Sequence, residues 1–235
     1  MIGFTTVTFR NKSIEEIIDI AKKADVDGIE WGGDVHVTSV QEAHRAKNLM
    51  GQMAVTSYGT YYKCENNEIE NIIEIANALD APTIRVWCGS ESPSNNTSYE
   101  ELVSKNLKKL CTSTHRNITL EYHRGTLTEN YKSTLNILNK VDCKNLFTMW
   151  QPNPDISYEE HFEEIKNLKP YIKNVHVFNW ENREVKNQRF LLRDNLKKWS
   201  EYINLIGENN YILEFVKDNR DENFISDINS LKGLI

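Results

Sequence analysis

A strand-like run followed by a helix-like run repeats eight times along this chain of 235 residues. The strand-like runs are short and rich in Val, Ile, Thr and aromatic residues, which favour extended backbone; they cover residues 2–9, 28–31, 52–57, 83–87, 117–121, 145–149, 172–178 and 211–215. Strict alternation of strands and helices favours parallel strands joined by right-handed crossovers. Eight such units without a break in composition predict one α/β domain over residues 1–235, folded as a (β/α)8 barrel.

The helix-like runs carry apolar residues three and four positions apart, the spacing of a helix face that packs on a sheet. The first run begins after Ser13, which forms a capping-box pattern with Glu16. The other helices are predicted over residues 40–50, 68–79, 99–114, 128–138 and 157–168, in a run that ends near residue 206, and over 224–231. A doubly wound open sheet is the structural alternative, but no glycine-rich dinucleotide fingerprint follows the first strand, which weakens it.

Composition argues against several classes of function. The formal net charge is −6 and the pI about 5.6, whereas a general affinity for nucleic acid needs a basic surface. No apolar run is long enough to span a membrane. The four cysteines form no Cys-x-x-Cys pair and the sequence starts with no signal peptide, so reduced thiols in a cytoplasmic protein are expected.

Polar and aromatic side chains gather at the carboxyl ends of the predicted strands, where barrels of this kind place their sites. The stretch Leu120-Glu121-Tyr122-His123 shows the pattern. Side chains alternate along a strand, so Glu121 and His123 share one face. The other strand ends contribute Glu30, Trp31, Asp34, His36, Arg85, Trp87, Gln151, Asn153, His176, Asn179, Trp180, Glu214 and Lys217.

Alternation with apolar neighbours also predicts which charged side chains face the barrel interior: Arg85, Glu121, His176 and Glu214. Several acids inside a barrel need a cationic partner, because an unpaired buried charge is strongly unfavourable. One divalent cation would serve, and two carboxylates, an amide oxygen and an imidazole suit Mn²⁺, Mg²⁺, Co²⁺ or Zn²⁺ with positions left for substrate. The donors of this set come from consecutive strands: Glu121, Gln151, His176 and Glu214.

The acids have a plainer interpretation as structural ion pairs. Glu121 and Glu214 could pair with Arg85 or Lys217 instead of serving a site. Their position at a barrel mouth favours the site. Arg85 is expected to be a buried partner of Glu30 and not a contact to substrate.

The histidines, the glutamine and the tryptophans also have two interpretations each. His176 could be a core histidine whose ring nitrogens bond to other protein groups instead of a metal ligand. Gln151 could hydrogen-bond only to substrate or water. Trp87 and Trp180 could stack on a sugar face or serve as ordinary core or rim aromatics. Three further histidines fall in helix regions and are expected at the surface: His44, His115 and His161.

Five segments together resemble the xylose isomerase-like TIM barrels, a superfamily that includes sugar-phosphate isomerases and epimerases, hydroxypyruvate isomerases, inosose dehydratases and endonuclease IV. The segments are Gly28-Ile29-Glu30-Trp31-Gly32-Gly33-Asp34-Val35-His36, Leu120-Glu121-Tyr122-His123, Trp150-Gln151-Pro152-Asn153, Val175-His176-Val177 and Leu213-Glu214-Phe215. The resemblance extends over essentially the whole chain and implies one divalent metal held by a Glu–Asp–His–Glu set. Glu121, His176 and Glu214 match three of these positions. Gln151 stands at the aspartate position, and a neutral amide binds a hard cation less strongly than a carboxylate.

The resemblance further implies proton transfer at a carbon next to a carbonyl in a small sugar or sugar derivative, through an enediolate that the metal stabilises. Glu121 and Glu214 would act as the acid–base pair, one removing the proton and the other returning it. His123 would hold a substrate oxygen, and His36 is a second candidate for that role. Barrels of this kind are often dimers or tetramers, so a homo-oligomer is implied as well.

Three other functions fit parts of the sequence. A dehydratase on the same scaffold needs only a leaving group β to the abstracted proton, and a non-catalytic sugar-binding barrel would follow if Gln151 weakens the metal site. An endonuclease IV-like phosphodiesterase would need a three-zinc cluster, for which the six histidines and the acidic pI offer little support. The loop after the seventh strand is basic and could serve a phosphate or a carboxylate through Arg183, Lys186 and Arg189.

Overall fold

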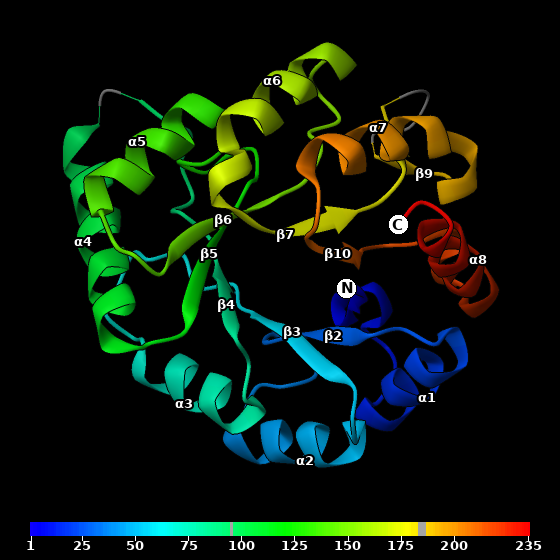
Figure 1. Ribbon diagram of the computed structural model, residues 1–235. Coiled ribbons are helices and arrows are strands. Elements are labelled where there is room, and N and C mark those ends of the chain that lie inside the picture. Colours follow the sequence, from blue (N-terminus) through cyan, green and yellow to red (C-terminus); the bar gives the residue numbers. More distant parts are fainter. Residues whose placement is uncertain (95, 183–186) are drawn as a thin grey trace.

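The computed structural model describes residues 1–94, 96–182 and 187–235 (Figure 1). Its strands are β1 (Ile2–Thr5), β2 (Gly28–Gly32), β3 (Ala54–Gly59), β4 (Thr83–Val86), β5 (Asn117–Glu121), β6 (Leu146–Trp150), β7 (Ile172–Val177), β8 (Trp180–Glu181), β9 (Gln188–Arg189) and β10 (Asn210–Leu213). Its α-helices are α1 (Ile14–Ala24), α2 (Val40–Met50), α3 (Glu70–Leu79), α4 (Thr97–Ser113), α5 (Tyr131–Val141), α6 (Tyr158–Leu168), α7 (Leu196–Ile206) and α8 (Asp221–Lys232). Four 3-10 turns are η1 (Thr6–Phe9), η2 (Lys169–Tyr171), η3 (Leu192–Asn195) and η4 (Lys217–Asn219).

The large sheet closes into a barrel in the order β1–β10–β7–β6–β5–β4–β3–β2. Every neighbouring pair in the barrel is parallel, and the α-helices surround it on the outside (Figure 1). This arrangement confirms the predicted (β/α)8 barrel. A small antiparallel ribbon, β8–β9, is added in the loop after β7. Within the described ranges, no helix has both the length and the apolar character needed to cross a membrane.

The main hydrophobic core lies between the strands and the helices, because every second strand residue points outward. In β2, Ile29 and Trp31 are fully buried, and the Trp31 indole donates to the Met50 sulfur on α2 at 3.2 Å. α1 packs its apolar stripe on this layer and begins with the predicted capping box between Ser13 and Glu16. The residues between these outward positions point into the barrel, and they form the site.

The first strand is shorter than predicted, because the chain turns into η1 after β1. Two hydroxyl groups stabilise this turn: Thr6 Oγ1 accepts from the Gly32 amide at 2.9 Å, and Thr8 Oγ1 accepts from the Phe215 amide at 3.0 Å. Gly32 is the last residue of β2, and Phe215 follows the end of β10. These two strands flank β1 in the barrel. The turn therefore ties together the carboxyl ends of three neighbouring strands.

The helix after β5 starts later than predicted, at Tyr131 instead of residue 128. The Thr128 hydroxyl donates to the Glu121 carbonyl at 2.7 Å, which ties the loop to the end of β5. Asn130 then caps the helix by accepting from the Ser133 amide at 3.0 Å. The extra loop residues thus support the strand end that carries Glu121.

Candidate functional site

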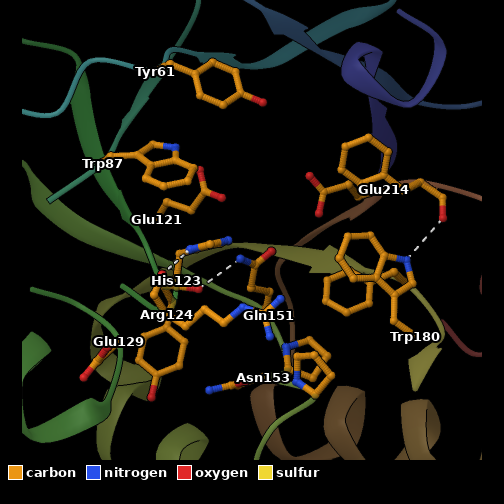
Figure 2. Close-up of a pocket in the computed structure, with 15 residues that line it drawn as sticks. Tyr61, Trp87, Glu121, His123, Arg124, Glu129, Gln151, Asn153, Trp180 and Glu214 are labelled. Carbon is orange, nitrogen blue, oxygen red and sulfur yellow. Dashed lines mark hydrogen bonds between the residues drawn. The ribbon is translucent and has the colours of Figure 1, made fainter. Parts of the chain in front are cut away.

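A pocket of about 250 Å³ opens at the carboxyl ends of β4, β5, β6, β7 and β10, where the sequence predicts the site (Figure 2). Polar side chains that line it include Glu121, His123, Glu129, Gln151 and Glu214. Figure 2 shows Glu121 and Glu214 on opposite sides of the pocket, with open space between their carboxylates. The two acids predicted to act as a pair therefore both reach one cavity.

Aromatic side chains form two walls of this pocket. On one side the Trp87 ring lies 4.6 Å from the His123 ring and 5.8 Å from the Tyr61 ring, centroid to centroid. On the other side Trp180 stacks on Phe178 at 4.4 Å and lies 5.5 Å from Phe215. Trp87 and Trp180 are thus placed on facing walls, so both can contact a bound ring or carbon chain.

Beneath the pocket, five side chains form a line of alternating charge across the barrel interior, here named the charge chain: Glu121, Arg85, Glu30, His176 and Glu214. Arg85 contacts the Glu121 carboxylate through Nη1, and its Nε and Nη2 each lie 3.2 Å from Glu30 Oε1. His176 Nε2 lies 3.1 Å from the same Glu30 oxygen, and Nδ1 lies 3.4 Å from Glu214 Oε2. The expectation that Arg85 is a buried partner of Glu30 is confirmed.

The three inner members of the charge chain, Arg85, Glu30 and His176, have pKa values that favour their charged forms. Burial alone would lower the pKa of His176, but the charges of Glu30 and Glu214 outweigh it and raise that pKa to about 10. Burial would raise the pKa of Glu30, but Arg85 and His176 hold it well below its usual value. The pKa of Arg85 is raised because Glu30 and Glu121 outweigh the effect of burial. The barrel interior therefore contains charges whose partners are other side chains.

β3 leaves room for the guanidinium by means of a glycine. Gly59 pairs with Arg85 in the register of β3 and β4. A Cβ atom at position 59 would lie 3.2 Å from Glu30 Oε1 and closer still to the Arg85 guanidinium. Because Arg85 is only 2% exposed and ion-paired on both sides, it cannot swing away from such an atom.

Replacing Gly59 by alanine is therefore expected to lower the free energy of unfolding by about 1–3 kcal/mol through overpacking. Urea denaturation checks this value. Gly233→Ala is the matched control, since an added Cβ there would meet nothing closer than 3.5 Å. Equal stability of the two variants would show that the guanidinium is free to move.

Two polar side chains of the pocket are oriented by backbone carbonyls. His123 Nδ1 lies 2.6 Å from the Arg124 carbonyl, which can only accept, so Nδ1 carries the proton and Nε2 of the neutral ring is an acceptor. Gln151 Nε2 donates to the Tyr122 carbonyl at 3.0 Å. Trp87 lines the pocket, but its Nε1 is buried and has no hydrogen-bond partner among the described residues.

His36 is not among the residues that line the pocket. It is buried, and its ring nitrogens lie 2.9 Å from Thr6 Oγ1 and 2.9 Å from the Lys12 carbonyl. The chain turns back after β2, and His36 consequently braces η1. The role of His36 in holding a substrate oxygen has no support in this placement.

Sequence reasoning did not single out Arg124, which lines the pocket and pairs with Asp155 at 2.5 Å. No local pattern marks it, because it follows a strand end like many surface arginines. Of the basic loop residues, Arg183 and Lys186 lie outside the described residues. Arg189 lies over the Phe215 ring at 4.7 Å and donates to Asn219 Oδ1 at 2.7 Å.

Behind β5 and β6 lies a buried acid that the sequence did not reveal. Glu164 of α6 accepts a hydrogen bond from the Tyr122 hydroxyl at 2.5 Å and from Trp150 Nε1 at 3.4 Å. His161 on the same helix is 1% exposed and bonded to the Tyr202 hydroxyl at 2.6 Å, so its expected surface position is wrong. Helical spacing alone could not show that α7 would cover this face.

Burial raises the pKa of Glu164 from 4.5 to about 7, against the effect of its two hydrogen bonds. A carboxyl whose pKa is higher in the folded state contributes stability that is fully present below pH 4.5 and is lost as the pH rises through about 7. At about 1.4 kcal/mol per pH unit of pKa shift, we expect the wild type to lose about 3 kcal/mol more than Glu164→Gln over this range. Urea denaturation as a function of pH measures the difference. Glu163→Gln, at an exposed position of α6, should follow the wild type; parallel curves for all three proteins would contradict the assignment.

The predicted metal donors do not converge on one point. The structure contains no group of three or more His, Cys, Asp or Glu side chains that could hold a metal ion, over residues 1–94, 96–182 and 187–235. Glu121 is engaged by Arg85, and His176 lies between Glu30 and Glu214. The described residues therefore do not fit a resident divalent ion, and the metal remains a prediction from the sequence. The three-zinc cluster of the endonuclease IV alternative lacks support for the same reason.

Comparisons with known proteins agree with this architecture. A family model described as xylose isomerase-like TIM barrel matches residues 18–234. A 3-dehydroshikimate dehydratase of Bacillus anthracis is 25% identical in an alignment of 201 residues that covers 74% of this chain and 70% of that protein. The structure of the probable 3-DHS dehydratase involved in petrobactin synthesis in the same organism has a TM-score of 0.78 at 19% identity and covers 98% of each chain.

Two further solved structures share the fold. A 3-keto-D-glucoside 4-epimerase from E. coli, in its apo form, has a TM-score of 0.71 at 14% identity, covering 99% of this chain and 98% of that one. The IOLI protein with a bound zinc atom has a TM-score of 0.72 at 14% identity, covering 99% and 95%. At these identities the likeness shows the fold alone.

Proposed function

The chain belongs to the xylose isomerase-like TIM barrel family, and from this membership and the pocket we propose that it is an isomerase or epimerase of a small sugar or sugar derivative. The observation that carries the proposal is the position of Glu121 and Glu214 on opposite sides of one cavity (Figure 2). Two carboxylates that flank a substrate carbon can exchange a proton with it from either face. Relatives that are named as a dehydratase and an epimerase support chemistry of this kind.

In the proposed reaction one glutamate removes a proton from the carbon next to a substrate carbonyl, and the electron pair moves onto the carbonyl oxygen to give an enediolate. The other glutamate returns a proton. Return to the opposite face of the same carbon gives an epimer. Return to the neighbouring carbon, with the hydroxyl proton of the enediolate passing to the former carbonyl oxygen, gives an isomer. Because the described residues do not fit a divalent ion, no step of this proposed reaction uses a metal ion.

The polar and aromatic groups of the pocket would position the substrate. His123 Nε2 can accept from a substrate hydroxyl, because Nδ1 faces the Arg124 carbonyl. Trp87 and Trp180 would cover the two faces of a sugar ring or chain.

A dehydratase is the second candidate, and the likeness to a 3-dehydroshikimate dehydratase favours it. It would use the same first step. The electron pair of the enediolate then expels a hydroxyl group β to the carbonyl, and a protonated glutamate gives that hydroxyl a proton so that water leaves.

Incubation with ketose–aldose pairs, 3-keto sugars and 3-dehydroshikimate in D2O tests both candidates. We expect exchange of one substrate C–H for deuterium, together with a rearranged or dehydrated product, by proton NMR. A Glu121→Gln/Glu214→Gln protein is the control and should give neither. Tight sugar binding by calorimetry that a chelator does not change, with no exchange of any substrate, would instead identify a non-catalytic sugar-binding barrel.

A further inference from the structure

The case for a divalent cation in this barrel is that several interior acids need a positive partner. In the described residues they already have one, since Arg85 lies directly between Glu30 and Glu121. Arginine keeps its charge at any pH at which the protein is folded. We propose that the Arg85 guanidinium takes the place of the divalent ion, so that the two pocket carboxylates are held by side chains and the site works without a metal.

The first support is that Glu121 is already paired with Arg85. A metal ion would have to bind this same carboxylate. Its carboxylate contacts Arg85 Nη1, and the rest of the guanidinium is held by Glu30 through Nε and Nη2. An ion bound by Glu121 would sit against this guanidinium, and two positive charges at such a separation repel each other strongly in a buried site. Arg85 cannot withdraw, because its side chain is 2% exposed and has no route to solvent.

The second support is the shape of the barrel at this level. Gly59 lies opposite Arg85 in the register, and even a single methyl group at that position would overlap the guanidinium. Ser57 also donates to Glu30 Oε2 at 2.5 Å, so both oxygens of Glu30 are used. The planar guanidinium matches the space and reaches two carboxylates at once, which a lysine ammonium could not do in the same geometry.

The third support is the residue at the remaining donor position. Gln151 brings a neutral amide where a carboxylate would add charge for a hard cation. Its Nε2 donates to the Tyr122 carbonyl at 3.0 Å, so the uncharged Oε1 is the one atom it could offer to an ion. Arg85 thus supplies one fixed positive charge on β4, and the residue after β6 adds no negative charge. This charge balance is the one expected if a side-chain cation serves in place of an ion.

Arg85 does not line the pocket and acts through Glu121, so it is a positioning residue. The inference rests on the proposed function only in taking this pocket as the reaction site. Its test needs no substrate, so a failure of the metal result and a failure to find turnover can be told apart.

The test is calorimetric titration of chelator-treated, dialysed protein with MnCl2 and with ZnCl2, together with the thermal midpoint at each metal concentration. We expect the wild type to show no saturable binding that depends on Glu121 and Glu214, and no rise of the midpoint. The thermal midpoint of Arg85→Met should rise with the Mn²⁺ concentration, since this variant leaves Glu30 and Glu121 free to bind a new cation. Arg85→Lys, which keeps the charge, is the matched control and should not respond; Arg85→Gln replaces Arg85→Met if the latter gives no folded protein.

Binding of one ion per wild-type chain that is lost in Glu121→Gln or Glu214→Gln would overturn the proposal. Ion binding that these variants leave unchanged lies elsewhere on the protein and supports it. An uncharged variant at position 85 that ignores Mn²⁺ as the wild type does would show that the guanidinium does not stand in place of an ion, and would also overturn it.

Discussion

Replacing Arg85 by methionine is expected to lower the free energy of unfolding by about 3–5 kcal/mol, the largest stability effect we expect from one substitution in this chain. The side chain is 2% exposed and its guanidinium contacts Glu30 and Glu121. Methionine fills much of the volume but leaves two carboxylates facing each other without a cation between them. Urea denaturation at neutral pH measures the loss, with the slope of the transition reporting whether the unfolding stays two-state.

Arg45→Met is the control for this substitution. Arg45 also pairs with a glutamate, Glu15, at 2.7 Å, but both side chains are largely exposed to solvent. An exposed pair contributes about 0–1 kcal/mol, so this variant should stay close to the wild type. Arg85→Lys should fall between the two. Similar stabilities of Arg85→Met and Arg45→Met would mean that the charge chain does not stabilise the barrel.

Replacing either pocket glutamate by glutamine is expected to reduce kcat by about 10²–10⁴-fold, the usual contribution of a positioned acid or base. Glutamine keeps the shape of the side chain and can still accept a hydrogen bond, but it cannot take up a proton. Once a substrate has been found, kcat and the rate of C–H exchange in D2O should fall together in Glu121→Gln and Glu214→Gln. KM should change far less, because the aromatic walls of the pocket remain.

Glu74→Gln, on the exposed face of α3, is the control for the loss of one negative charge and should keep full activity. The double variant should lose little more than the worse single variant, because the two acids serve one reaction. Circular dichroism must show a folded protein in each case. Exchange at the wild-type rate in either single variant would remove that glutamate from the proton transfer.

Most of the fold could be predicted because its signals are local. The period-two pattern of the strands and the spacing of apolar residues in the helices are set by neighbours in the sequence. The exceptions have causes far along the chain. Residues Thr6–Phe9 look as strand-like as those before them, and what turns them is the Thr8 hydroxyl meeting the Phe215 amide. His161 looks like a surface residue until Tyr202 of α7 covers it.

The sequence could predict which way the side chains of the site point, but not which side chains they contact. Alternation correctly placed Glu121 and Glu214 at the pocket and Arg85 and His176 in the barrel interior. It could not show that Arg85 would meet Glu121, since a strand pattern says which face a side chain takes and not which neighbour it reaches. A family resemblance has the same limit, because it transfers donor positions and does not say which of them a neighbouring arginine contacts.

The closed order of the barrel has a consequence for how the protein forms during translation. Glu30 and His176 are separated by 146 residues, so at about 5–20 residues per second the acid is made roughly 7–30 s before this partner. β1 likewise has to wait for β10 before its second edge is paired. Nascent chains are thus expected to remain open, curved sheets with two free edges, one of them on β1, and a hydrated Glu30 carboxylate until β10 emerges. Hydrogen exchange on ribosome-stalled chains should show the β1 amides that face β10 becoming protected only after residue 213 has left the exit tunnel.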